Sequence, residues 1–531
     1  MKGLASPLSR RNFLAQLSTP ALAAAGLSGT TWAAESTSQL ATFNVKSFGA
    51  RGDGVTPDTT ALQKAIDACA QSGGGTVYLP PGRYLSGTIF LRSHVTVELD
   101  AGATLLGSTK LEDYPPTISS VRSYTDNYTE RSLIYAENLQ QIGLQGRGLI
   151  DGQGGAFKGA YKVRPYLIRI IGCRDVCVRE LTLKDSPMWV QHYLACDGVR
   201  IDGITVSSKC NANNDGIDID GCQRVRIANC DISSGDDAIV LKSTLARACK
   251  NVVITNCLLS SDCNAFKLGT ESNGGFENIV LGNCSIYDTR LAGIALEEVD
   301  GGVLDGVSIS NVTMNNVKGP IFIRLGNRAR PFRENMEKPA MGELRNVMIS
   351  QVQATGADRT GCCLAGLPGH LIENITLSNI RISSAGGGTA AAARRQIPEN
   401  PEAYPEYSMF GVLPAYGFYC RHARNLVLDN VEVSVATPDE RSSLICEDVN
   451  TLRLSAWRAG TGSGKVPVIE FQDVTEAIVQ GCRGPRTDRP YLKIRGKNSS
   501  RIEVLPTEAT AGANGIQIGT EVKKGAVNAR R

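Results

Sequence analysis

The chain is poor in aromatic residues and carries almost no charge imbalance. Aromatic side chains make up 6% of its 531 residues, and the formal net charge is +4. Lys2, Arg10 and Arg11 lie in an N-terminal segment that we expect to be removed on export, and without them 53 basic residues face 52 acidic ones. A nearly neutral chain is a poor binder of polyanions, so nucleic acid is not an expected partner. Any affinity for acidic ligands must come from local arrangement.

Several structural classes are excluded by what the chain lacks. With 42% hydrophobic residues, 20% charged residues and 56 glycines, the composition is that of a folded, turn-rich protein and not of a disordered or coiled-coil one. Beyond the N-terminal segment no apolar run is long enough to span a membrane. The sixteen cysteines are scattered and lack the framework of a small disulfide-rich domain. We expect most of them in the core.

Residues 1–34 have the features of a cleaved export signal. A charged start (SRRNFL) is followed by an alanine-rich apolar stretch over 14–27 and by small residues before Glu35. Arg10 and Arg11 match the twin-arginine pattern, which directs folded proteins to the Tat export machinery of bacteria. We predict a periplasmic or secreted protein with no membrane contact after cleavage. The alternative is a membrane anchor, for which the apolar run is shorter than the ~20 residues required.

A short unit recurs along most of the chain. Its asparagine-centred turns begin at Asn229, Asn256, Asn283 and Asn311, at intervals of 27, 27 and 28 residues. Fixed periods of this size indicate a solenoid. The segments between the turns alternate apolar and other residues with the period of two that strands require. The sequence therefore predicts an all-β fold, a right-handed parallel β-helix with each coil ~4.8 Å above the last.

The ends and one insertion of the β-helix are also expected from the sequence. Residues 58–70 form an amphipathic helix, with Asp58 as N-cap, that closes the N-terminal end. We place the catalytic β-helix at residues 35–505 and a loose tail, low in hydrophobic residues, at 506–531. Glycines and prolines interrupt the period over residues 385–415, which we interpret as an inserted loop that borders a binding groove.

Four consecutive coils can be aligned by their inward apolar pairs. These pairs are Ile217/Ile219, Ile239/Leu241, Phe266/Leu268 and Ile294/Leu296. Two positions before them stand Asp215, Asp237, Asn264 and Ala292. The alignment predicts that Asp215, Asp236 and Asp237 lie within roughly 5–10 Å of one another. Continued by one coil, the alignment matches Ile323 and Leu325 with the inward-facing residues. It places Arg324 beside Ala295, in the column of outward-facing residues that also contains Lys267.

Three carboxylates on neighbouring coils repel one another. Their repulsion raises the pKa of one member and leaves the others ionised, as general acid/base chemistry needs, without a metal or cofactor. A solvated acidic edge and a calcium site are alternatives. The spacing of Asp215, Asp218 and Asp220 does not fit an EF-hand loop, because Gly216 stands where the second ligand should be.

Several motifs resemble glycoside hydrolase family 28, the polygalacturonase and rhamnogalacturonase family of parallel β-helices. NNDGID (213–218) is similar to the family's NTDGID, SGDDAI (234–239) to its paired-aspartate motif, and RGLIDGQG and SPMWVQH to flanking coils. The resemblance implies hydrolysis of pectin backbones with inversion. It also implies that Asp236 is the general acid, while Asp215 and Asp237 activate water, with ~6.5–9.5 Å between acid and base.

Two family motifs are missing. Cys263-Asn264-Ala265 stands where the resemblance predicts Gly-His-Gly, and Ala295-Leu296-Glu297 stands where it predicts Arg-Ile-Lys, the motif that holds the galacturonate carboxylate. Lys267 and Arg324, one coil before and one coil after the missing arginine, are the candidates for a displaced carboxylate clamp.

The candidate substrate-binding residues follow from these alignments. They are Asn213, Lys242, Asn264, Lys267, Arg324, His192, Arg421 and His422. For the lysines the alternative role is neutralisation of the aspartates, and for Arg324, Arg328 and Arg330 a solvated basic face. His192 lies either on the groove floor or in a turn. Arg421 and His422 follow the inserted loop and fall outside the family's pattern.

Three functions are consistent with these features. The leading one is an exported glycoside hydrolase acting on an acidic, pectin-type polysaccharide or oligosaccharide. The second is a polysaccharide lyase or epimerase on the same scaffold, which would need calcium and a basic residue as proton acceptor. The third is a β-helix that binds carbohydrate without catalysis.

Overall fold

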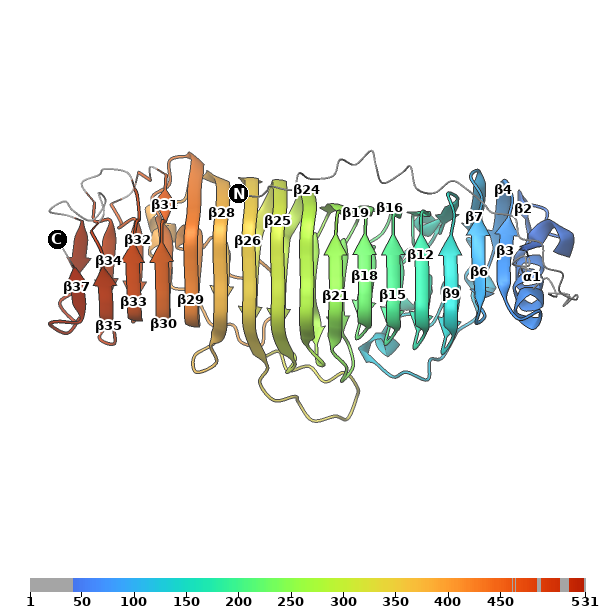
Figure 1. Cartoon of the computed structure of the whole chain (residues 1–531), viewed down its shortest axis with the longest axis horizontal. Helices are drawn as coiled ribbons and strands as arrows, with labels where there is room; N and C mark the ends of the chain where they lie inside the picture. The colour runs from blue at the N-terminus through green and yellow to red at the C-terminus, as the bar shows by residue number, and fades with distance from the viewer. Residues whose placement is uncertain (1–41, 461, 464, 485–488, 507–514, 530–531) are drawn as a thin grey trace, which may run out of the picture. The chain divides into compact units, whose positions relative to one another are not determined.

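The computed structural model describes residues 42–460, 462–463, 465–484, 489–506 and 515–529. The predicted export signal, residues 1–34, lies outside this part of the chain. Within it, thirty-seven strands form one continuous ladder in which all pairings between named strands are parallel (Figure 1). The predicted parallel β-helix is thus confirmed. None of the helices in the described ranges is long and apolar enough to cross a membrane.

Each early coil contains three strands, and each strand pairs with the equivalent strand of the next coil. The N-terminal coils comprise β1 (Thr42–Asn44), β2 (Asp53–Pro57), β3 (Gly75–Leu79), β4 (Gly82–Ser86), β5 (Ile89–Phe90), β6 (Val95–Leu99), β7 (Ala103–Gly107), β8 (Ser132–Glu137), β9 (Gln140–Gln145) and β10 (Leu149–Asp151). The middle coils comprise β11 (Tyr166–Ile171), β12 (Arg174–Arg179), β13 (Thr182–Lys184), β14 (Gln191–Leu194), β15 (Asp197–Asp202), β16 (Thr205–Ser208), β17 (Ile217–Asp220), β18 (Gln223–Ala228), β19 (Asp231–Ser234), β20 (Ile239–Ser243), β21 (Cys249–Thr255), β22 (Leu258–Ser261) and β23 (Phe266–Ser272).

In β24, β25, β26, β28, β29 and β30 the strands of a coil run together around its corners, whereas β27 and β31–β37 are short again. The C-terminal coils comprise β24 (Phe276–Glu298), β25 (Val303–Leu325), β26 (Glu343–Ala357), β27 (Cys362–Ala365), β28 (Ile372–Gly386), β29 (Ala415–Thr437), β30 (Ser442–Ser455), β31 (Arg458–Ala459), β32 (Ile469–Gln472), β33 (Thr475–Gln480), β34 (Leu492–Arg495), β35 (Ser500–Val504), β36 (Ile516–Ile518) and β37 (Val527–Ala529). The connections include short 3-10 helices, η1 (Val45–Phe48), η2 (Leu111–Asp113), η3 (Tyr124–Asn127), η4 (Gly154–Ala156) and η5 (Tyr161–Val163).

The repeating asparagines hold the corners of successive coils. Asn229, Asn256, Asn283 and Asn311 have φ values of 59°, 56°, 56° and 56°, the left-handed region that asparagine tolerates better than most residues. They also contact one another along the stack, since the Asn311 side chain donates to Oδ1 of Asn283 at 2.7 Å. The interior is apolar, and all sixteen cysteines are free, thirteen of them buried. The expectation that most cysteines belong to the core is confirmed.

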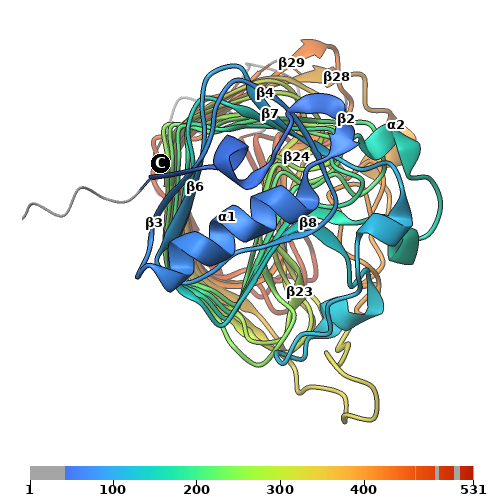
Figure 2. The ribbon, with the colours of Figure 1, turned by 90° about the vertical axis from the view of Figure 1, so that its right-hand side faces the viewer.

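The N-terminal end of the β-helix is closed by α1 (Thr59–Gln71), which crosses the end of the coil stack (Figure 2). Its apolar face buries Leu62, Ile66 and Cys69, as predicted. The predicted N-cap role of Asp58 is wrong in one respect, because its carboxylate makes no capping bond to the helix. It accepts instead from the backbone N–H groups of Arg51 at 2.6 Å and Gly52 at 2.9 Å, and so fixes the preceding turn.

The C-terminal segment differs from the loose tail expected from its composition. In the described part of it, β36 pairs with β34 and β37 pairs with β35. Backbone pairing with a preceding coil does not require apolar side chains, so composition gave no sign of it.

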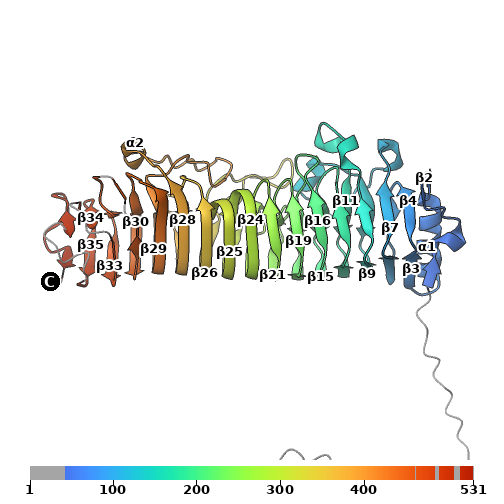
Figure 3. The same cartoon turned by 90° about the horizontal axis from the view of Figure 1, so that it is seen from above.

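A long loop leaves the stack between β28 and β29. Residues 387–414, hereafter the inserted loop, contain the short helix α2 (Ala390–Ala393). Figure 3 shows α2 among the loops that protrude along one side of the stack.

Candidate active site

The turns that precede β17, β20 and β23 bring the predicted acidic residues together. Ile217 pairs with Ile239, and Ile239 with Phe266, as the sequence alignment required. Asp215 and Asp237 therefore occupy equivalent turns on adjacent coils, and the backbone N–H of Gly216 donates to the carbonyl oxygen of Asp237 at 2.9 Å. We call Asp215, Asp236 and Asp237 the aspartate cluster.

Asp236 is the member of the cluster that is partly exposed to solvent. Its Oδ1 accepts the backbone N–H of Asp237 at 2.9 Å. Its backbone carbonyl accepts the hydroxyls of Ser234 and Ser261, both at 2.6 Å, which fixes the turn. Burial and the negative charge of Asp237 raise the pKa of Asp236. This residue therefore combines access to a ligand with a tendency to keep its proton.

Asp237 has the opposite environment, with 2% of its surface exposed. Its Oδ1 accepts the side-chain amide of Asn264 at 2.8 Å, and its Oδ2 lies 3.5 Å from Nζ of Lys267. Burial favours the neutral form, but Lys267, Lys242 and the hydrogen bond from Asn264 outweigh it and lower the pKa of Asp237. The two adjacent aspartates are thus driven toward different protonation states.

Asp215 shares one cation with Asp218. Nζ of Lys242 lies 3.8 Å from a carboxylate oxygen of each and 3.7 Å from Glu271. Burial raises the pKa of both Asp215 and Asp218, and repulsion adds to it, from Asp218 in the case of Asp215 and from Asp237 and Asp220 in the case of Asp218. Neither oxygen of Asp218 accepts a hydrogen bond from the described residues. The expected ionised state of Asp215 is therefore not what its surroundings favour, because alignment alone did not reveal Asp218 as a second buried carboxyl.

Lys267 faces the aspartate cluster, as predicted from its outward column. Besides Asp237, it pairs with Glu297 at 3.7 Å and lies 5.5 Å from the ring centroid of Tyr404 in the inserted loop. Burial raises the pKa of Glu297 to about 8 against the effect of Lys267. The lysine is 2% exposed, so its first role is to hold Asp237 ionised.

The predicted position of Arg324 is wrong by two residues. Ile321 pairs with Ile294, so Phe322 lies beside Ala295 and Arg324 beside Glu297. The alignment assumed an offset of 29 residues between paired positions, whereas the offset is 28 at Thr289 and Val317 and falls to 27 after one extra residue in β24 between Thr289 and Ala292. The sequence could not show this, because Ile321, Ile323 and Leu325 alternate with a period of two that fits either register.

Arg324 is consequently not available as a substrate clamp. Its guanidinium donates to the carbonyl oxygens of Gly366 at 3.0 Å and Glu399 at 2.6 Å, and it is 1% exposed. Burial lowers the pKa of Arg324 to about 10. It secures the base of the inserted loop.

Arg421 and His422 also act on the inserted loop. Arg421 donates to the carbonyl oxygens of Ile397 at 2.9 Å and Pro398 at 2.7 Å. The His422 ring bridges Asp448 at 2.7 Å and Glu399 at 3.1 Å. The structure therefore places both residues beneath the loop.

The remaining candidates lie on the other side of the aspartate cluster. His192 is fully buried, with Nε2 3.2 Å from Asp220 and its ring between those of Tyr166 and Trp189. Asn213 has a φ of 57°, and its side-chain oxygen accepts from Arg164 at 2.9 Å. Asn213 supports a turn beside the cluster, whereas His192 lies in β14 and contacts Asp220 of β17, so it is not a turn histidine.

Residues from loops complete the site, and strand periodicity gave no signal for them. Arg328 pairs with Asp300, and Arg330 pairs with Glu271. Burial favours the neutral form of Glu271, but Lys242, Arg328 and Arg330 outweigh it and lower the pKa of Glu271 to about 2. Arg328 and Arg330 are therefore not the solvated basic face that was one alternative. Tyr404 comes from the inserted loop, whose bordering role was expected but whose contacts were not.

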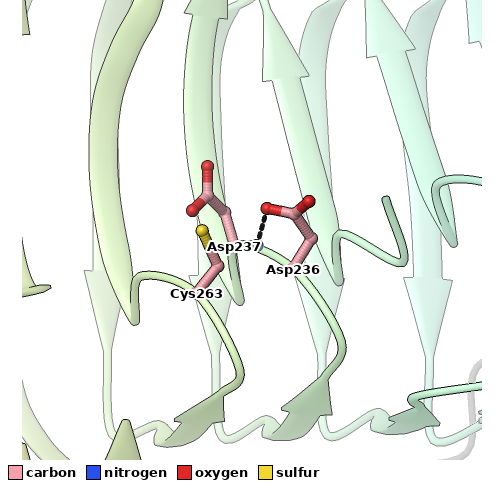
Figure 4. Close-up of side chains that lie close together, drawn as sticks. All are labelled: Asp236, Asp237 and Cys263. Carbon is pink, nitrogen blue, oxygen red and sulfur yellow. Dashed lines mark hydrogen bonds between the residues drawn. The ribbon is translucent and has the colours of Figure 1, made fainter. Parts of the chain in front are cut away.

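Asp236, Asp237 and Cys263 converge closely enough to suggest a metal site (Figure 4). One possible ligand atom from each lies within 4.8 Å of the others. The hydrogen bond from Asn264 and the ion pair with Lys267 already engage both oxygens of Asp237. These contacts favour a pair of carboxyls that act as acid and base over a metal site at this position.

The chain is similar to a known family and to several known proteins. The model described as "Glycosyl hydrolases family 28" matches residues 69–400. A probable polygalacturonase of Vitis vinifera is 37% identical over 214 residues, covering 37% of this chain and 43% of that protein. The exo-poly-alpha-D-galacturonosidase of Dickeya chrysanthemi is 27% identical over 251 residues, covering 37% and 41%. The chain thus spans about two fifths of the length of these curated relatives.

The fold is also found among solved structures. The hyperthermoactive exopolygalacturonase of Thermotoga maritima superposes with a TM-score of 0.56 at 24% identity, over 65% of this chain and 87% of that one. At this level of identity the likeness concerns the β-helix itself.

Proposed function

The chain belongs to glycoside hydrolase family 28, and we propose that it is an exported enzyme that hydrolyses glycosidic bonds in an acidic, pectin-type polysaccharide. The observation that carries the proposal is the pair Asp236 and Asp237, adjacent carboxyls whose pKa values are shifted in opposite directions. The names of the relatives, polygalacturonase and galacturonosidase, support the substrate class. The twin-arginine segment supports export.

In the proposed reaction Asp236 donates its proton to the leaving glycosidic oxygen. Asp237 remains ionised beside Lys267 and accepts a proton from the attacking water, so that the C–O bond to the leaving sugar breaks as the bond to water forms. Asp215 orients the water from the adjacent coil, with Asp218 beside it. Lys242 balances these two carboxyls.

We propose inversion at the anomeric carbon, as the family resemblance implies. A carboxylate oxygen of Asp236 and one of Asp237 lie within 4.8 Å of each other, which is less than the ~6.5–9.5 Å typical of the acid and base of inverting enzymes. The configuration of the first-formed product is therefore an informative test of whether water enters between these residues.

The deciding experiment is a screen of the purified protein against pectic polysaccharides and oligosaccharides. We expect new reducing ends without absorbance near 235 nm, because hydrolysis, unlike elimination, makes no unsaturated product. Proton NMR of the first product reports its anomeric configuration. Unsaturated products would favour a lyase, and the absence of cleavage on every pectic substrate would refute the proposed function.

A further inference from the structure

A second hollow lies on the far side of the inserted loop from the aspartate cluster. It has a volume of about 640 Å³, and its walls come from residues 393–397 of the loop, from residues 465–467 and from β29, β30, β32 and β34. Tyr419 and Ile445 contribute to its floor, and Pro414, Pro467 and Pro490 contribute apolar surface. We call it the basic cavity.

The basic cavity and the aspartate cluster share one outward face of the β-helix. The register runs without interruption through Lys267, Ala295, Phe322, Cys363, Tyr419, Ile445 and Glu470. Tyr419 is four steps of ~4.8 Å from Lys267 and Glu470 is six, so the cavity begins about 19 Å from Lys267 along the stack and Glu470 lies about 29 Å from it. The inserted loop lies between them, with Tyr404 beside Lys267 and residues 393–397 in the wall of the cavity.

Cations predominate in the cavity. Five are present, namely Arg394, Arg395, Lys465, Lys493 and Arg495, against the two acids Glu447 and Glu470. Glu470 is matched by Arg495, and Glu447 accepts the hydroxyl of Tyr419 at 2.7 Å.

Four of these cations have no ion pair in the described part of the chain. Among the described residues no carboxylate lies within 4.0 Å of Arg394, Arg395, Lys465 or Lys493, although Arg395 donates to the carbonyl oxygens of Phe410 and Val412 and Lys493 interacts at longer range with Glu521. Lys267 and Lys242 at the aspartate cluster are each matched by carboxylates. Cations without an ion-pair partner among the described residues are therefore found in the basic cavity and not among the lysines of the aspartate cluster.

We propose that the basic cavity is a second saccharide-binding site, which holds a carboxylate-bearing stretch of polysaccharide away from the bond that is cleaved. Several cations around a hollow suit a ligand with several spaced carboxylates better than a ligand with one. The apolar floor suits the faces of sugar rings. A polymer long enough to bridge about 19–29 Å reaches the aspartate cluster from this site, whereas a disaccharide does not.

The site goes beyond the proposed hydrolysis, and its binding can be measured without catalysis. The probe is an oligogalacturonate of about six residues, titrated by calorimetry into the Asp236→Asn protein at low salt. In this background Lys493→Ala with Arg495→Ala weakens binding about threefold to tenfold, because exposed charges each contribute modestly. Glu470→Gln strengthens it about twofold, and added salt weakens it.

Arg501→Ala is the matched control. Arg501 is an exposed arginine of the C-terminal coils paired with one glutamate, Glu476, as Arg495 is paired with Glu470, but it lies outside the cavity. Its replacement leaves binding unchanged. Equal losses in the control and in the double variant, or wild-type affinity in the double variant, refute the site.

Two further ligands test its chemistry. An uncharged galactan oligomer should bind at least tenfold more weakly than the oligogalacturonate. Equal affinity would refute recognition by charge, and binding of a sulfated polysaccharide in the absence of oligogalacturonate binding would refute the uronate ligand.

Kinetics separate this site from the proposed activity. If the protein cleaves pectic chains, the double variant raises the ratio of the KM for polymer to the KM for disaccharide, and an unchanged ratio counts against the site. If no pectic chain is cleaved yet oligogalacturonate binding depends on Lys493 and Arg495, the proposed hydrolysis fails and the second site stands.

Discussion

Replacement of Asp236 by asparagine isolates proton donation from the other roles of this residue. Burial and the charge of Asp237 raise the pKa of Asp236 and so favour its protonated form, which asparagine matches in shape and charge. The asparagine oxygen can still accept the backbone N–H of Asp237, which Oδ1 of Asp236 accepts at 2.9 Å. The turn and the ionised state of Asp237 are therefore preserved, and only the transferable proton is removed.

The expected loss follows from that separation. General acid catalysis contributes about 10²–10⁴-fold, so kcat on a natural polysaccharide falls by this factor, or about 2.7–5.4 kcal/mol in activation free energy. An aryl glycoside with a good leaving group needs little protonation and loses much less. Deprotonation of Asp236 limits activity at high pH, so the alkaline limb of the pH–rate profile disappears in the variant.

Initial rates on both substrates across pH measure these effects. Asp231→Asn is the matched control, because Asp231 is an exposed aspartate on β19, five residues before Asp236. Thermal unfolding of both variants checks that the fold is retained. Wild-type turnover of a natural polysaccharide by Asp236→Asn would remove this residue from the mechanism.

Three other predictions concern electrostatics, the core and the corners. Lys267→Met raises the pKa of Asp237, which Lys267 now lowers, so the acid limb of the kcat profile moves to higher pH and activity at low pH is lost first; an unmoved limb contradicts this role. Ile254→Ala, in the fully buried interior of β21, lowers the free energy of unfolding by about 2–5 kcal/mol in chemical denaturation, whereas Val253→Ala, 43% exposed on the same strand, changes it by less than about 0.5 kcal/mol. Asn256→Ala, at a φ of 56°, costs about 1–2 kcal/mol while Asn256→Gly is better tolerated, and equal losses for the two would show that conformation is not the cause.

The sequence by itself determined the β-helix and the place of the aspartate cluster. Each coil repeats a short alternating unit, and in the middle coils its residues pair with those 22 to 29 positions away. The alignment of Ile217, Ile239 and Phe266 is therefore written in the local pattern, and it carries Asp215 and Asp237 into neighbouring turns.

Only the tertiary structure decided which groups the charged side chains contact. The pairing of β24 with β25 puts Arg324 in the column of Glu297 and not in that of Ala295, and apolar alternation is blind to a shift of two. The course of the inserted loop, which has no period, determined that Arg324 and Arg421 bind its carbonyl oxygens and that Tyr404 covers Lys267. Periodic backbone pairing is a local property of a sequence, whereas the partner of a long charged side chain depends on every segment that folds back over it.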